Sequence, residues 1–105
     1  VRDRDCILID DIVDSGGTLI NAANALLDRG GARSVASYIT HGVLSGAAAE
    51  RIGASRIRRM TITNSILATK MVAESQNIQQ ISIAPLLAAA IERIHNEQSV
   101  SSLFN

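Results

Sequence analysis

The fold is decided by the stretch Cys6-Ile7-Leu8-Ile9-Asp10-Asp11-Ile12-Val13-Asp14-Ser15-Gly16-Gly17-Thr18. Its first four residues form a short apolar run, which is typical of a strand that is covered on both faces in a parallel sheet. From residue 19 to residue 27 apolar side chains recur at helical spacing, and Gly30-Gly31 ends that pattern. The stretch therefore predicts a strand, a loop over residues 10–18 and a helix.

The same alternation continues along the chain. Further strands are predicted at residues 35–39, 57–62 and 78–83, and helices at 47–52, 68–74 and 85–94. Such alternation is typical of one α/β domain, here residues 1–105, with a mainly parallel sheet flanked by helices on both faces. The chain begins with Val1 rather than Met, so we expect upstream strands to be missing. The sheet would then be incomplete at its amino-terminal side and expose an edge.

The composition excludes several classes of partner. The chain has 105 residues, 47% of them apolar, and its ten basic residues balance its ten acidic ones. A neutral chain lacks the basic surface that nucleic acid requires. Its apolar runs are far shorter than the roughly 20 residues that cross a bilayer. We therefore expect a cytoplasmic domain that binds neither nucleic acid nor membrane.

The loop has the composition of a phosphate site. Ligands of open α/β sheets bind beyond the carboxyl ends of the strands, where this loop is predicted to lie. Gly16 and Gly17 let the backbone approach a phosphate closely, and the amides of the following helix carry partial positive charge. Ser15 and Thr18 add hydroxyl donors. The loop therefore predicts phosphate binding without a cationic side chain.

The aspartates suggest a sugar beside the phosphate. Asp10 and Asp11 are pure acceptors when ionised and suit the two hydroxyl donors of a vicinal diol. Asp14 is an anion next to an anion site, so we expect it to cap loop or helix amides. Proton handling near the sugar is its alternative role. The structural alternative for residues 10–18 is an ordinary turn with a helix cap.

Residues 7–19 resemble the signature shared by phosphoribosyltransferases and ribose-phosphate pyrophosphokinases. This signature is a hydrophobic strand, two acidic residues and two apolar residues, followed by Asp-Thr/Ser-x-Gly-Thr. The resemblance implies a type I phosphoribosyltransferase-like fold. Three later segments, residues 36–48, 62–66 and 84–104, are similar to the pyrophosphokinases, and the last is similar to their carboxyl terminus. Two departures are Ser65, where the family has Thr, and Leu67, where it often has Pro.

The chain thus resembles the carboxyl-terminal part of a ribose-phosphate pyrophosphokinase. The implied reaction transfers pyrophosphate from ATP to ribose 5-phosphate, giving phosphoribosyl pyrophosphate and AMP with Mg²⁺. By position, the resemblance assigns the ribose hydroxyls to Asp10 and Asp11. It assigns the 5-phosphate to Asp14, Ser15, Gly16, Gly17 and Thr18.

The same resemblance implies what this stretch of chain lacks. The family's ATP-contacting, metal-ligating and catalytic residues correspond to positions upstream of Val1, so no catalytic or metal residue is expected here. The chain alone is therefore predicted to be inactive. The alternatives are another phosphoribosyltransferase and a non-catalytic regulatory paralogue of the synthetase.

The carboxyl-terminal tail is a second candidate site. A polar tail after a helix is usually frayed. The resemblance instead implies that Ser99, Ser101 and Phe104 help to form a regulatory site for ADP or inorganic phosphate between subunits of a hexamer. Hydroxyls two residues apart on an extended chain project to the same side, which suits a shared anion.

Other polar residues are given structural roles. We expect His41 to hydrogen-bond within a turn and His95 to favour the carboxyl end of its helix. The basic residues Arg51, Arg56, Arg58 and Arg59 are expected to form a solvated face or a subunit contact, with a phosphate or nucleic-acid site as the alternative.

Overall fold

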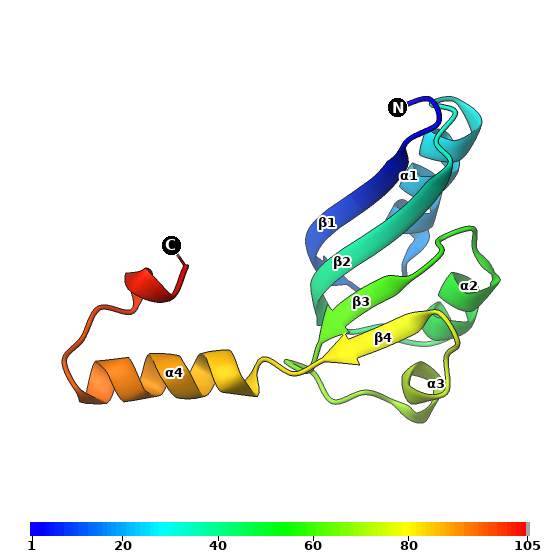
Figure 1. Ribbon diagram of the computed structural model, residues 1–105. Helices are drawn as coiled ribbons and strands as arrows, with labels where there is room; N and C mark the ends of the chain where they lie inside the picture. Colours follow the sequence, from blue (N-terminus) through cyan, green and yellow to red (C-terminus); the bar gives the residue numbers. More distant parts are fainter. Residues whose placement is uncertain (105) are drawn as a thin grey trace.

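The computed structural model describes residues 1–104. A four-stranded parallel sheet in the order β1-β2-β3-β4 forms its centre (Figure 1), so the predicted α/β class is confirmed. The elements are β1 (Asp5–Val13), α1 (Gly17–Asp28), β2 (Ser34–Gly42), α2 (Ala48–Ala54), β3 (Met60–Thr63), α3 (Lys70–Ala73), β4 (Ile78–Ile81), α4 (Ala84–His95) and the 3₁₀ helix η1 (Ser101–Phe104).

Strand β1 is longer than the sequence pattern predicts. Residues 10–13 were expected in the loop, but they continue the strand, with Asp10 opposite Ile39 and Ile12 opposite His41 of β2. The nine-residue β2 pairs with Asp10, Ile12 and Val13. The connection to α1 therefore contains only residues 14–16, and both adjacent aspartates lie on a strand.

The core lies between the sheet and α1, α2 and α3, which cover one face (Figure 1). The largest side chains with relative exposure below 2% come from the strands and from α2 and its flank. They are Val35, Ile52, Ile57, Met60 and Ile62. Burial of such side chains is the main stabilising contribution to the fold.

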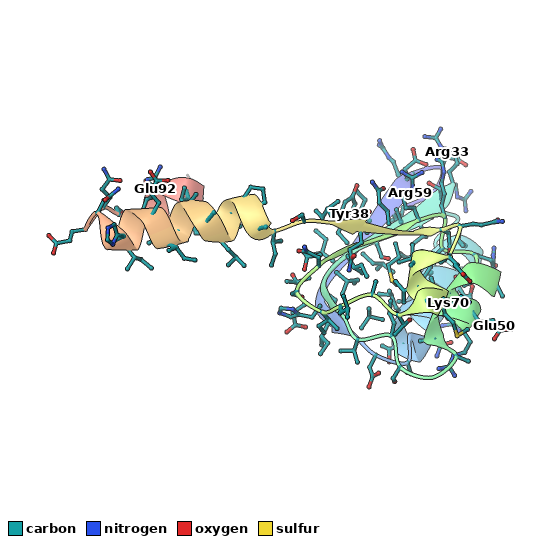
Figure 2. All side chains as sticks on the ribbon, turned by 90° about the horizontal axis from the view of Figure 1, so that it is seen from below. Arg33, Tyr38, Glu50, Arg59, Lys70 and Glu92 are labelled. Atoms are coloured by element: carbon teal, nitrogen blue, oxygen red, sulfur yellow. The ribbon has the colours of Figure 1, made fainter. Side chains whose placement is uncertain are left out.

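The expectation of helices on both faces is wrong for this chain. Ile7 and Ile9 of β1 are 58% and 81% exposed, and Tyr38 of β2 is 50% exposed. Figure 2 shows Tyr38 and Arg59 on the side of the sheet away from α1 and α2. A parallel sheet covered on both faces and one covered on a single face can have strands with the same apolar pattern. The sequence pattern alone therefore could not distinguish the two.

Strand β3 begins later than predicted, at Met60 instead of Ile57. The backbone N–H of Arg58 donates to the carbonyl of Val35 (2.8 Å), and Ile57 is buried at 2% exposure, so both belong to the turn before the strand. The Asn77 amide holds this turn, because its Nδ2 donates to the carbonyls of Ile52 and Ile57 at 2.9 and 3.1 Å. The turn is thus held by one backbone bond to β2 and by the Asn77 side chain.

The ion pair of Asp5 and Arg33 joins β1 to the chain before β2 at the amino edge of the sheet. Arg33 Nε donates to Asp5 Oδ1 at 3.0 Å, and the hydroxyl of Ser34 donates to the same oxygen at 2.6 Å. The Arg33 hydrogen bonds, and then that of Ser34, hold the pKa of the Asp5 carboxyl well below its usual range. Both side chains are more than half exposed, so the pair contributes little to stability.

Helix α4 extends away from the sheet (Figure 1). Pro85 stands in its first turn as predicted, and Asn64 fixes its start by accepting from the N–H of Ile83 (2.9 Å) and donating to Ser82 Oγ (3.3 Å). Its apolar side chains remain exposed, including Leu87 at 53% and Ile91 at 67%. None of the described helices is long and apolar enough to cross a membrane.

Candidate functional site

The corner between β1 and α1 requires glycine at one position. Gly16 is the residue that precedes α1 and has φ +82°, a left-handed conformation that L side chains disfavour. A Cβ added to Gly16 would lie 3.0 Å from Ile52 Cδ1 in the core. Gly17 has an ordinary φ, and the nearest atom to its added Cβ is Ser15 Oγ at 3.8 Å. The backbone conformation and the nearby core therefore require glycine at position 16, and neither requires it at position 17.

The first turn of α1 has free amide donors. Gly17 N–H donates weakly to Ser15 Oγ (3.4 Å), and the regular helical bonds start with Ile20 N–H to Gly16 O (2.9 Å). Within residues 1–104, the N–H groups of Thr18 and Leu19 have no hydrogen-bond acceptor. Unpaired amides at a helix start attract anions through their hydrogens and through the helix dipole.

A cavity of about 440 Å³ opens between β1 and α1 at this corner. The predicted site residues that line it are Asp10, Asp14, Ser15, Gly16 and Thr18, together with apolar side chains from β1 and α1. Asp11 and Gly17 are absent from its lining. The fold thus brings one acidic strand residue and the phosphate-type loop to a single cavity.

The two adjacent aspartates are not equivalent. They follow one another on β1, where successive side chains point to opposite faces. Asp10 lines the cavity, and its Oδ1 accepts the backbone N–H of Asp11 at 2.8 Å. Asp10 is therefore the better placed of the two to accept hydrogen bonds from a ligand beside the loop.

Asp14 contacts the second loop of the sheet rather than α1. Its Oδ1 accepts the backbone N–H of Ser45 (3.3 Å) and also the Ser45 hydroxyl. The expected capping of an amide is thus found, with a donor 31 residues away in sequence. The Ser45-Gly46 pair is visible in the sequence, but its partnership with Asp14 depends on the parallel pairing of β1 with β2.

His41 is hydrogen-bonded beside a turn, as expected. Its Nδ1 lies 2.7 Å from Ser65 Oγ, and Ser65 also donates to the carbonyl of Thr40 at 3.3 Å. Thr63 Oγ1 donates to that same carbonyl at 2.6 Å. These contacts join the ends of β2 and β3 next to the candidate site.

Metal ligands are sparse in this structure. The described residues contain no group of three or more His, Cys, Asp or Glu side chains that could hold a metal ion. Mg²⁺ prefers six oxygen ligands in octahedral geometry and often takes several from water and substrate phosphates. Asp10, Asp11 and Asp14 alone do not fit a resident magnesium ion.

The tail brings its two predicted serines together. Ser99 Oγ and Ser101 Oγ lie 2.8 Å apart. The expected extended chain is not found, because Ser101 begins the 3₁₀ helix η1, and the turn into that helix brings the two hydroxyls together. Arg93 of α4, which the sequence did not single out, donates to the carbonyl of Ser99 at 3.1 Å and to the Ser102 hydroxyl. Phe104 is 68% exposed. This cluster lies far from the loop at residues 14–16 (Figure 1).

Known proteins resemble this chain over its whole length. Ribose-phosphate pyrophosphokinases of Granulibacter bethesdensis and Mesorhizobium japonicum are 63% and 58% identical to all of it, and it spans 34% and 33% of their lengths. The crystal structure of phosphoribosylpyrophosphate synthetase from Mycobacterium smegmatis matches with TM-score 0.84 and 38% identity over 92% of this chain and 32% of that one. The family model of the phosphoribosyl synthetase-associated domain matches residues 1–105. The chain therefore belongs to the phosphoribosyl synthetase-associated domain family.

Proposed function

We propose that the corner between β1 and α1 binds ribose 5-phosphate. The observation that carries this is the pair of unpartnered amides at Thr18 and Leu19, at the cavity that Asp10 also lines. The 5-phosphate accepts hydrogen bonds from the loop of Asp14, Ser15, Gly16, Gly17 and Thr18. The ribose hydroxyls donate to Asp10 and Asp11, with Asp10 making the closer contact.

In the whole protein, we propose that this site serves the pyrophosphokinase reaction named for the relatives. The anomeric oxygen of ribose 5-phosphate attacks the β-phosphorus of ATP, and the bond from that phosphorus to the oxygen bridging it to the α-phosphorus breaks to release AMP. Such a transfer depends mainly on positioning and on neutralising charge. The residues of this chain hold the acceptor sugar in place.

We assign the ATP site to parts of the parent protein outside this chain. Mg²⁺, which neutralises phosphate charge in such reactions, would be held by the ATP phosphates and by side chains from those parts. This assignment gives this chain a binding role without a catalytic one.

We further propose that the chain is the carboxyl-terminal third of a cytoplasmic, hexameric synthetase. The chain spans 34% of the length of the Granulibacter bethesdensis relative, which supports its being about one third of the whole protein. The resemblance of residues 84–104 to the family's carboxyl terminus supports its place in that protein. The exposed apolar residues of the sheet face and of α4 agree with burial against further protein. Peptide mapping and native mass spectrometry of the full-length protein would check the position and the assembly.

The purified 105-residue chain is expected to bind ribose 5-phosphate but to produce no AMP. Binding follows from the complete loop, and inactivity follows from the missing ATP site. Calorimetric titration with ribose 5-phosphate, ribose and inorganic phosphate should give the tightest binding for the compound that carries both groups. A coupled assay for AMP measures whether the chain has any turnover. Ribose 5-phosphate that binds no better than phosphate would refute the sugar site. Turnover near full-length rates would refute the assignment of the ATP site to parts of the protein outside this chain.

A separate regulatory role is proposed for the tail. Ser99 and Ser101 present two hydroxyls 2.8 Å apart, with Phe104 exposed nearby in sequence, and together they would contact ADP or inorganic phosphate at a subunit boundary. Hydroxyl pairs of this kind can donate to one phosphate group. The carbonyl contact from Arg93 keeps the tail folded beside α4.

Replacing Ser99 and Ser101 by alanine in the full-length protein is expected to weaken ADP inhibition by about tenfold, the effect of losing one hydrogen bond to a charged group. The KM for ribose 5-phosphate should not change, because the tail lies far from the loop (Figure 1). Inhibition curves at several ADP concentrations make the measurement. The matched control is Ser75→Ala, a serine in the connection between α3 and β4 whose hydroxyl donates to Asn77. Inhibition that is equal in wild type and double variant would exclude the assignment.

A further inference from the structure

The loop between β2 and α2, residues 43–47, is hydrogen-bonded to the end of β1. The backbone N–H groups of Val43 and Leu44 both donate to the carbonyl of Val13, at 2.9 and 3.2 Å. Val13 immediately precedes Asp14, the first residue of the connection to α1. The second loop is thus attached to the first one at the point where the candidate phosphate loop begins.

Leu44 holds this second loop in an unusual conformation. Its φ is +48°, which is uncommon for a non-glycine residue, and its side chain is only 2% exposed within the core. Leucine gains nothing locally from that φ, so the surrounding contacts must impose it. The buried side chain and the two bonds to Val13 therefore fix the direction in which the next residue, Ser45, leaves the core.

Ser45 is directed at Asp14. Both its backbone N–H and its hydroxyl donate to Asp14 Oδ1. Asp14 and Ser45 are both exposed, so these bonds contribute little to stability and mainly set the orientation of the carboxylate. An unrestrained carboxylate one residue before Ser15 could turn towards the helix amides and compete with a phosphate for them.

We propose that Ser45 is a positioning residue for the phosphate loop, acting by holding the Asp14 carboxylate away from the amides of Thr18 and Leu19. The inference rests on the proposed ribose 5-phosphate site and adds to it a residue from a different loop. It assigns Asp14 a role in shaping the loop, set by its bond to Ser45. The strained Leu44 backbone is the element that presents Ser45 in the required place.

The test is a double-variant cycle on the 105-residue chain, with ribose 5-phosphate affinity measured by calorimetry. Ser45→Ala is expected to lower the affinity about five- to tenfold, because the freed carboxylate competes with the phosphate. Ser45→Thr keeps the hydroxyl and should restore affinity to within about twofold of wild type. In an Asp14→Ala background, Ser45→Ala should change affinity by less than about twofold, because no carboxylate remains to be held.

The proposal is overturned if Ser45→Ala binds like wild type, or if it loses the same affinity with and without Asp14. A ligand-free measurement separates this failure from failure of the ribose 5-phosphate site. Asp14→Ala should speed hydrogen exchange of the Ser45 amide about tenfold or more, whereas the Val43 amide, bonded to Val13, should exchange as before. A Ser45 amide that does not respond contradicts the proposal even in a chain that binds ribose 5-phosphate.

Discussion

Gly16→Ala is expected to lower the melting temperature of the chain by about 8–16 °C. Alanine at the φ of +82° found here costs about 1–2 kcal/mol. Its Cβ would also lie 3.0 Å from Ile52 Cδ1, a side chain with 0% exposure that has little room to move. A total loss of about 2 kcal/mol corresponds to that shift for a domain of this size. Thermal unfolding followed by circular dichroism gives the measurement.

Gly17→Ala is the matched control, one residue further along. Its Cβ meets no atom closer than 3.8 Å, and alanine stabilises a helix relative to glycine by up to about 1 kcal/mol. We expect its melting temperature to equal or exceed that of wild type. Equal stability of the two variants would contradict the distinct roles of the two glycines.

The Ile52 contact can be examined separately. Ile52→Val removes the Cδ1 methyl and costs about 0.5–1.5 kcal/mol in an otherwise intact core. In the Gly16→Ala background its cost should be smaller, because it relieves the close approach of the new Cβ. Fully additive losses would show that the left-handed backbone alone, without the contact to Ile52, makes glycine necessary.

Asp10→Asn is expected to weaken ribose 5-phosphate binding by about 10- to 100-fold. A carboxylate that accepts hydrogen bonds from sugar hydroxyls contributes about 1.5–3 kcal/mol, and asparagine keeps the size but loses the charge and one acceptor. Asp11→Asn should have a smaller effect, because Asp11 is absent from the lining of the cavity. Both affinities can be measured by calorimetry on the purified chain.

Inorganic phosphate distinguishes a sugar contact from general damage to the loop. Removing a negative charge near an anion site favours the anion, so Asp10→Asn should bind phosphate as well as wild type or about twofold better. Asp3→Asn removes an exposed carboxylate at the other end of β1, where φ is +59° and asparagine is tolerated, and should leave both affinities unchanged. If Asp10→Asn weakened both ligands equally, the ribose assignment would be wrong.

Much of the fold could be predicted from local patterns. Apolar runs and helical spacing placed the four strands and the four α-helices near their observed positions, and the stop at Gly30-Gly31 and the start at Pro85 follow from backbone chemistry. The 3₁₀ helix η1 was not predicted. The misplaced boundaries were those that neighbours decide. Asp10 and Asp11 look like loop residues, but β2 pairs with the stretch that contains them. The residues predicted to open β3 form a turn instead, and the Asn77 side chain binds the carbonyl of Ile57 there.

The candidate site, like the fold, could be predicted from the sequence only in part. Local sequence indicated a loop with glycines, hydroxyls and aspartates, because these residue types carry a phosphate-type chemistry wherever they follow a strand. It could not show that Asp10 lines the cavity and Asp11 does not, since that depends on which face of β1 the helix covers. Nor could it connect Arg93 with Ser99, because that contact needs the turn after α4.

The sequence by itself determined the order of strands and helices, the phosphate-type loop and the resemblance to the synthetase family, since all of these depend on residues close together along the chain. Only the tertiary structure decided which residues meet. Gly16 is required because Ile52 of α2 lies beneath it, and Asp14 is oriented because Ser45 follows the parallel strand. Parallel pairing brings the ends of distant strands to one edge, so contacts there join residues that no local pattern relates.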